Sequence, residues 1–147
     1  MKTVIIDDDM FFTEVLSQKL KFFGFKIIQK IESFEELKNQ KVYPDVFFVD
    51  YHLKDSNCNR LINFIESKYK KATIVIMSSN DNAYKLLDSD IPHHFIQKSK
   101  IRHLKYKIQK IKKNISKGKK RAFNAKSIHF MLILSALYTL LSFLIDG

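Results

Sequence analysis

Polar side chains able to do chemistry follow four short apolar segments of the sequence. The segments are Thr3–Ile6, Asp45–Asp50, Thr73–Met77 and Phe95–Gln97, and the polar groups at their ends are Asp7-Asp8-Asp9, Asp50, Ser78-Ser79 and Lys98. If these segments are parallel strands of one open sheet, their carboxyl ends share the edge at which such sheets bind ligands. We therefore expect carboxylates, a hydroxyl and an ammonium group to converge at that edge.

Carboxylates gathered at one edge repel one another, and a cation would relieve that repulsion. A hard divalent ion, most naturally Mg²⁺, takes one or two carboxylates and keeps several waters. Such a site suits phosphoryl transfer. The metal and Lys98 would neutralise the phosphoryl oxygens, the Ser78 hydroxyl would donate a hydrogen bond, and one aspartate would be the nucleophile.

Each of these residues also has a purely structural interpretation. An acid after a strand is often the N-cap of the next helix, and Asp9 is expected to be one. Ser78 alone would be a turn residue, and Lys98 alone a solvated charge. The functional interpretation depends on the four strand ends taken together.

The segments that must position these groups alternate between strand and helix patterns. Phe25–Ile31 is predicted as a further strand. Helices are predicted at Met10–Phe23, after the capping-box pattern Ser33–Glu36, at Asn57–Tyr69, at Asn82–Leu87 and at Lys100–Ser116. The alternation predicts an α/β fold with a five-stranded, doubly wound parallel sheet.

Four motifs occur in order along residues 1–116: VIIDDD at 4–9, VFFVDYHLKDSN at 46–57, IVIMSS at 74–79 and FIQKS at 95–99. Together they resemble the receiver domain of bacterial two-component response regulators. The resemblance implies the flavodoxin-like version of the fold. It also implies a single-domain signalling protein of a phosphorelay, and not an enzyme that acts on an external substrate.

By motif match, the resemblance implies a role for each site residue. These roles are Asp50 as phospho-acceptor; Asp7, Asp8, Asp50 and the backbone carbonyl of His52 as Mg²⁺ ligands; Ser78 and Lys98 as the groups that contact the phosphoryl group; and Phe95 as the aromatic switch. The donor would be a histidine kinase or a histidine phosphotransfer protein. The output would be a contact with a downstream protein.

Two departures from the family's pattern lie in loops beside the site. Ser99 follows the lysine where the family usually has proline, so we expect a trans Lys98–Ser99 bond. Lys54 and Cys58 stand where the loop after the acceptor usually has proline and glycine, and Cys58 is interpreted as an incidental thiol in a polar loop. A degenerate pseudo-receiver is the alternative that these departures raise.

A phosphatase of the haloacid-dehalogenase type is a more distant alternative. Asp7-x-Asp9, Ser78 and Lys98 follow the order of nucleophile, hydroxyl and lysine in that family. Such enzymes need a further acid after the lysine, and residues 91–145 contain no Asp or Glu. The phosphatase interpretation also leaves Asp50 without a role.

Charge is divided unevenly along the 147 residues, whose formal net charge is +11. Residues 1–97 carry 13 Lys and Arg against 14 Asp and Glu, whereas residues 98–147 carry 13 against one. Cys58 is the single cysteine, which excludes a disulfide within the chain and favours a reducing compartment. The three acids directly after the first apolar run argue against a secretory signal.

A basic linker at 117–127 precedes Ile128–Ile145, a segment without Asp, Glu, Lys or Arg. A helix of this length spans roughly 27 Å, close to the thickness of a bilayer's hydrocarbon core. The basic residues before it predict a transmembrane anchor that holds the receiver at the cytoplasmic face of the bacterial inner membrane. The alternative is a cytoplasmic protein in which this helix packs in a homodimer. Nucleic acid is not expected as a partner, because residues 117–147 are too few for a helix-turn-helix domain.

Overall fold

The computed structural model of the protein describes residues 1–80, 82 and 94–117. The chain divides between Gln109 and Lys110 into two units, and the sheet belongs to the first. In the described ranges, no helix is both long enough and apolar enough to cross a bilayer. The predicted linker 117–127 and hydrophobic helix 128–145 lie outside these ranges apart from residue 117, and the domain boundary at 116 stays a prediction.

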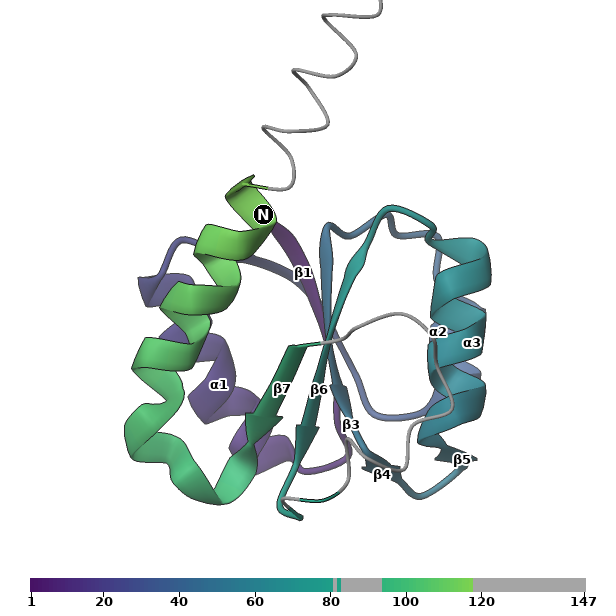
Figure 1. The fold of residues 1–147 in the computed structure, drawn as a ribbon. Coiled ribbons are helices and arrows are strands. Elements are labelled where there is room, and N and C mark those ends of the chain that lie inside the picture. Colours follow the sequence, from purple (N-terminus) through teal and green to yellow (C-terminus); the bar gives the residue numbers. More distant parts are fainter. Residues whose placement is uncertain (81, 83–93, 118–147) are drawn as a thin grey trace, which may run out of the picture. The chain divides into compact units, whose positions relative to one another are not determined.

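Strands and helices alternate along the first unit, as the sequence pattern predicts (Figure 1). The main sheet contains β1 (Lys2–Ile6), β2 (Lys26–Ile31), β3 (Val46–Asp50), β6 (Thr73–Ser78) and β7 (His94–Gln97). The helices among them are α1 (Met10–Phe22), α2 (Phe34–Lys38) and α3 (Cys58–Lys68). After β7 come the 3-10 segment η2 (Lys98–His103) and an α-helix over residues 104–117. The predicted helix Asn82–Leu87 lies outside the described residues, apart from its first residue.

All strand pairs of the main sheet are parallel, and the strand order is β2-β1-β3-β6-β7. Helix α1 lies on one face of the sheet, and α2 and α3 lie on the other (Figure 1). The predicted five-stranded, doubly wound sheet is therefore confirmed. The chain runs outward from β1 to β2 and then returns to place β3 on the other side of β1. Such a reversal opens a crevice at the carboxyl ends of the two strands.

Strand β3 is central, and all of Val46–Asp50 is buried. Alternate side chains of a strand point to opposite faces. Phe47 and Val49 accordingly belong to the core under α2 and α3, whereas the Phe48 ring packs edge-on against Phe25, with ring centroids 6.0 Å apart. Burial on both faces explains why β3 reads as a continuous apolar run in the sequence.

Helix α1 begins at the predicted Met10 and ends at Phe22, one residue before the predicted end. The Asp9 side chain accepts a hydrogen bond from the Phe12 amide at 2.9 Å, which confirms Asp9 as the N-cap. Gly24, just after the helix, has φ of 77°, a conformation that a side chain would penalise. Phe11 and Phe22 are 79% and 80% exposed, so these two apolar residues of the helical pattern do not belong to the core.

A short antiparallel hairpin follows β3, where the sequence pattern shows only a polar loop. It consists of β4 (His52–Leu53) and β5 (Ser56–Asn57). Asn57 then caps α3 by accepting a hydrogen bond from the Arg60 amide. Cys58 is the first residue of α3 and is buried, so its placement in a polar loop was wrong. Cys58 directly follows the Asn57 cap, and its side chain belongs to the hydrophobic core.

Candidate functional site

Asp7 and Asp50 lie beside each other at the point where the strand order reverses. Ile6 pairs with Val49 in the register of β1 and β3, so the next residue of each strand carries a carboxylate to the same place. Both residues are buried, with exposed fractions of 1% and 6%. Two carboxylates buried this far from water need a neighbouring cation to compensate their charge.

Lys98 supplies that partner from the end of β7. Its Nζ lies 2.8 Å from Asp7 Oδ2 and 2.7 Å from Asp50 Oδ2, and its side chain is only 11% exposed. The ammonium group also lies 4.9 Å from the ring centroid of Phe12, in the first turn of α1. A cation over an aromatic face is attracted to it, so the ring helps to hold the lysine in place.

Burial and the contacts between Lys98 and the two carboxylates act in opposite directions on the pKa values of Asp7 and Lys98. Burial raises the pKa of Asp7 to about 6, helped by the Asp50 charge and opposed by hydrogen bonds from Lys98 and from the Asp9 amide. Burial would lower the pKa of Lys98, but its hydrogen bonds to Asp50 and Asp7 outweigh that effect, and the pKa is raised. The lysine therefore carries a full charge at neutral pH.

Asp8 completes a three-carboxylate cluster with Asp7 and Asp50. Each residue offers one oxygen, and the three oxygens lie within 4.8 Å of one another. Oxygen ligands are those that Mg²⁺ and similar hard cations prefer. Asp7 and Asp50 are buried while Asp8 is half-buried, so the cluster is open toward solvent on the Asp8 side. The residues present fit a divalent cation.

The remaining predicted site residues lie at or near the same edge of the sheet. Ser78 is buried at the end of β6, one residue beyond Met77, which pairs with Asp50, and its Oγ accepts a hydrogen bond from the Asn80 amide at 3.1 Å. Phe95 is half-buried in β7 and packs against the core. His52 begins β4, two residues after Asp50. The Lys98–Ser99 bond is trans, as the serine predicts, and so are the other peptide bonds of the described residues.

Sequence reasoning missed two side chains that contact the site. Lys54 Nζ lies 3.2 Å from Asp8 Oδ2, and the Phe12 ring lies beside Lys98. Phe12 follows the Asp9 cap by three residues, the spacing at which the first helical turn faces back toward the cap, and that spacing could have identified it. No periodicity marks Lys54, because it lies in the turn of a hairpin.

A scan against models of known protein families gives no match, and neither does a comparison with curated proteins. Solved structures do match. RcsB from Salmonella enterica serovar Typhimurium, bound to promoter rprA with the phosphomimetic BeF3−, is 19% identical with a TM-score of 0.65, over 74% of this chain and 95% of that chain. The chain has the fold of a response-regulator receiver domain. At this identity, the likeness concerns the fold.

Two more matches support the receiver fold. The non-phosphorylated receiver domain of the stress response regulator RcsB from Escherichia coli is 19% identical with a TM-score of 0.65, over 80% of this chain and 94% of that chain. The response regulator PhyR from Brucella abortus is 16% identical with a TM-score of 0.60, over 73% of this chain and 45% of that chain. Another RcsB structure contains two dimers bound to two parallel DNAs. The expectation that nucleic acid is not a partner therefore gains no support from these receiver-fold proteins.

Proposed function

We propose that this protein is a phospho-accepting receiver of a two-component phosphorelay and that Asp50 is the acceptor. The observation that carries the proposal is the meeting of Asp50 with Asp7, Asp8 and Lys98 at the reversal of strand order. A dry carboxylate beside a charged lysine and two further acids is what transfer of a phosphoryl group to an aspartate requires. A histidine kinase or a histidine phosphotransfer protein would be the donor.

Each residue would have a separate task in the transfer. A carboxylate oxygen of Asp50 would attack phosphorus while the bond to the donor's leaving group breaks. Lys98, held between Asp7 and Asp50, would neutralise a phosphoryl oxygen, and the Ser78 hydroxyl would donate a hydrogen bond to another. Asp7, Asp8, Asp50 and the His52 carbonyl would hold Mg²⁺, which supplies charge stabilisation when bound.

The output would be a contact made by the face that carries Phe95. Phe95 lies in β7 three residues before Lys98, so a change at the lysine would reach Phe95 along one short strand. Phosphorylation would shift that face between two states, and a partner would bind one of them better. The role is that of a signalling domain whose only chemistry is its own phosphorylation and dephosphorylation.

The test of the acceptor is phosphorylation by acetyl phosphate with Mg²⁺, followed by intact-protein mass spectrometry. We expect the full chain to gain one phosphoryl group and the Asp50→Asn variant to gain none. Asp45→Asn is the matched control, because Asp45 lies just before the opposite end of the same strand. Label retained on Asp50→Asn would remove the assignment in favour of another acceptor, whereas a wild type that gains no label would favour the pseudo-receiver.

We further propose that residues 128–145 tether the receiver to the cytoplasmic face of the bacterial inner membrane. The support is the uncharged length of the segment and the basic residues before it. Alkaline-carbonate extraction of membranes would distinguish a membrane anchor from a helix that packs in a soluble dimer. An anchored protein stays in the membrane while a 1–121 truncation is released. If the full chain is also released, the helix packs in a soluble dimer instead.

A further inference from the structure

The hairpin after the acceptor strand brings a second lysine to the carboxylate cluster. Lys54, four residues after Asp50, places its Nζ 3.2 Å from Asp8 Oδ2. The two cations of the cluster differ in exposure: the Lys98 side chain is 11% exposed, whereas that of Lys54 is 86% exposed. Lys54 therefore faces the solvent side of the cluster, by which a hydrated ion would arrive.

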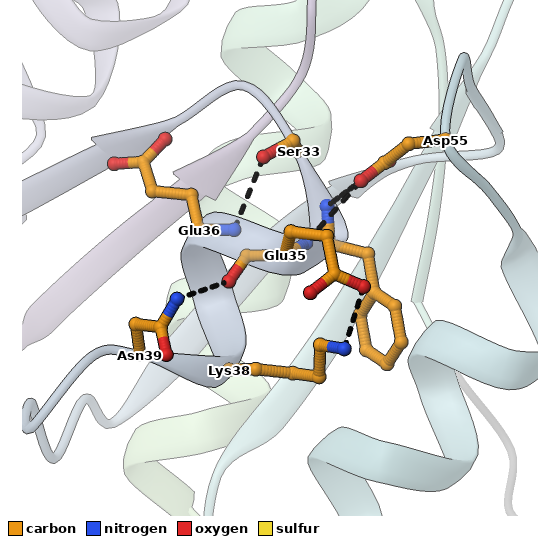
Figure 2. Close-up of polar contacts among 7 residues, drawn as sticks. Ser33, Glu35, Glu36, Lys38, Asn39 and Asp55 are labelled. Atoms are coloured by element: carbon orange, nitrogen blue, oxygen red, sulfur yellow. Dashed lines mark hydrogen bonds and ion pairs between the residues drawn. The ribbon is translucent and has the colours of Figure 1, made fainter.

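The backbone on both sides of Lys54 is fixed. Before it, Leu53 is buried and pairs with Ser56 across the hairpin. After it, the Asp55 carboxylate accepts hydrogen bonds from the Phe34 amide at 2.8 and 3.0 Å and from the Glu35 amide at 3.2 Å. Figure 2 shows Asp55 reaching the first turn of α2 in this way. Lys54 is thus carried by an anchored turn.

The charges explain what a lysine does in this position. Three carboxylates and two ammonium groups leave the cluster with one formal negative charge. A divalent cation that takes Asp8 Oδ2 must break the Lys54 ion pair, and one that takes either oxygen of Asp8 is repelled by the nearby ammonium group. Without Lys54, the cluster would carry two formal negative charges and would attract the cation more strongly.

We propose that Lys54 is a built-in counter-ion of Asp8 that Mg²⁺ must displace, so that Lys54 sets the metal affinity of this site. The inference rests on the proposed function, because it takes the cluster to be the Mg²⁺ site. It gives Lys54 a role in metal binding and gives Asp55 the role of a positioning residue for Lys54. A receiver with this lysine requires more Mg²⁺ before phosphorylation than one without it.

The test is a calorimetric titration of the full, unphosphorylated chain with MgCl₂ at low ionic strength. We expect Lys54→Met, which keeps an unbranched side chain and removes the charge, to bind Mg²⁺ about three- to tenfold more tightly than the wild type. The gain should shrink as ionic strength rises, because salt screens exposed charges. Lys54→Arg keeps the charge and should bind as the wild type does.

Two controls make the result specific. Lys71→Met removes the same charge from an exposed lysine between α3 and β6, at the opposite edge of the sheet, and should leave the affinity unchanged. Asp8→Asn should abolish the binding heat, which shows that the heat comes from this cluster. If Asp55 positions Lys54, Asp55→Ala should tighten Mg²⁺ binding in the wild type but not in a Lys54→Met background. Structural damage to the hairpin, which also carries the His52 carbonyl, would weaken Mg²⁺ binding in both backgrounds and would overturn the positioning role of Asp55.

The outcomes separate the two proposals. Tighter binding by Lys54→Met but not by Lys71→Met supports the role of Lys54. Equal Mg²⁺ affinities for the wild type and Lys54→Met overturn that role and leave the metal site intact. If neither the wild type nor Lys54→Met binds Mg²⁺, the metal site of the proposed function is itself wrong.

Discussion

Lys98 Nζ lies 2.7 Å from Asp50 Oδ2, although Asp50 ends β3 and Lys98 follows β7, and these two strands are not neighbours. Strand β6 lies between β3 and β7, so Lys98 reaches Asp50 past an intervening strand. Neighbouring strands are about 4.8 Å apart, so the long Lys98 side chain, the Asp50 side chain and the 2.7 Å contact between them together bridge two strand spacings. A long cationic side chain just after β7 therefore suits this site both geometrically and electrostatically.

Removal of the Lys98 charge should destabilise the protein strongly. Lys98→Met leaves Asp7 and Asp50 buried beside each other without a cation, and we expect unfolding free energy to fall by about 2–4 kcal/mol near neutral pH. Urea denaturation followed by circular dichroism measures the change. Lys30→Met is the control, because Lys30 pairs with Glu14 at the surface and such pairs contribute about 0–1 kcal/mol. If both variants lose the same unfolding free energy, the buried group of Lys98, Asp7 and Asp50 stabilises the protein no more than a surface ion pair does.

Asp7 should make stability depend on pH with an unusual sign. Burial raises its pKa from 3.8 to about 6, so the folded state binds the proton more tightly than the unfolded state does. Stability is then lost as pH rises from the lower value to the higher one, and the loss is complete above it. A shift of about two pKa units corresponds to about 3 kcal/mol.

Asp7→Asn removes this penalty. Without divalent metal, we expect the variant to be more stable than the wild type by about 2–3 kcal/mol at about pH 7.5, with the difference vanishing near pH 4. Urea denaturation at several pH values, with a chelator present, gives the comparison. A variant that is less stable than the wild type at neutral pH would mean that the Lys98 contact outweighs the burial of Asp7.

The strand ends of the site were predictable for a simple physical reason. Asp7, Asp50, Ser78 and Lys98 each follow a continuous apolar run, and a parallel sheet brings the carboxyl ends of such runs together. The structure places all four residues at this edge. The structure also shows that Lys98 pairs with both Asp7 and Asp50. This pairing depends on the length of the lysine side chain, which the sequence pattern does not reveal.

The hairpin could not be predicted in the same way. Its strands have two residues each, too few to show an alternation, and its turn residues are charged and exposed. Asp55 contacts an amide 21 residues earlier in the chain, and a single exposed acid gives no sign of so distant a partner. The capping-box pattern was incomplete for a similar reason. Ser33 does accept a hydrogen bond from the Glu36 amide, but the Glu36 carboxylate accepts from the Glu32 amide and not from the Ser33 amide. Asp55 accepts from the Phe34 and Glu35 amides of the first turn.

The Asp55 cap should contribute measurably to stability. Asp55→Ala leaves the Phe34 and Glu35 amides without their acceptor, while the Ser33 cap stays in place, so we expect a loss of about 1–2 kcal/mol. Asn39→Ala is the control from the other end of α2, where an exposed amide donates to the Glu35 carbonyl (Figure 2). Its effect should stay below about 0.5 kcal/mol. If both variants lose the same amount, the tertiary cap is no stronger than an ordinary surface contact.

Cys58 should be almost unreactive in the folded protein. Burial and the nearby Asp50 charge raise the pKa of its thiol to about 12, so only about one molecule in ten thousand holds the reactive thiolate at about pH 8. We expect alkylation by iodoacetamide to be at least a hundredfold slower in the native protein than in concentrated urea.

Cys58 lines a surface hollow of about 380 Å³ together with hairpin residues that include Leu53 and Asn57. Asp55→Ala, which loosens that hairpin, should therefore speed native alkylation, whereas Asn39→Ala should not. Fast alkylation of the native wild type would mean that the hairpin opens readily, and an open hairpin could not hold Lys54 against Asp8.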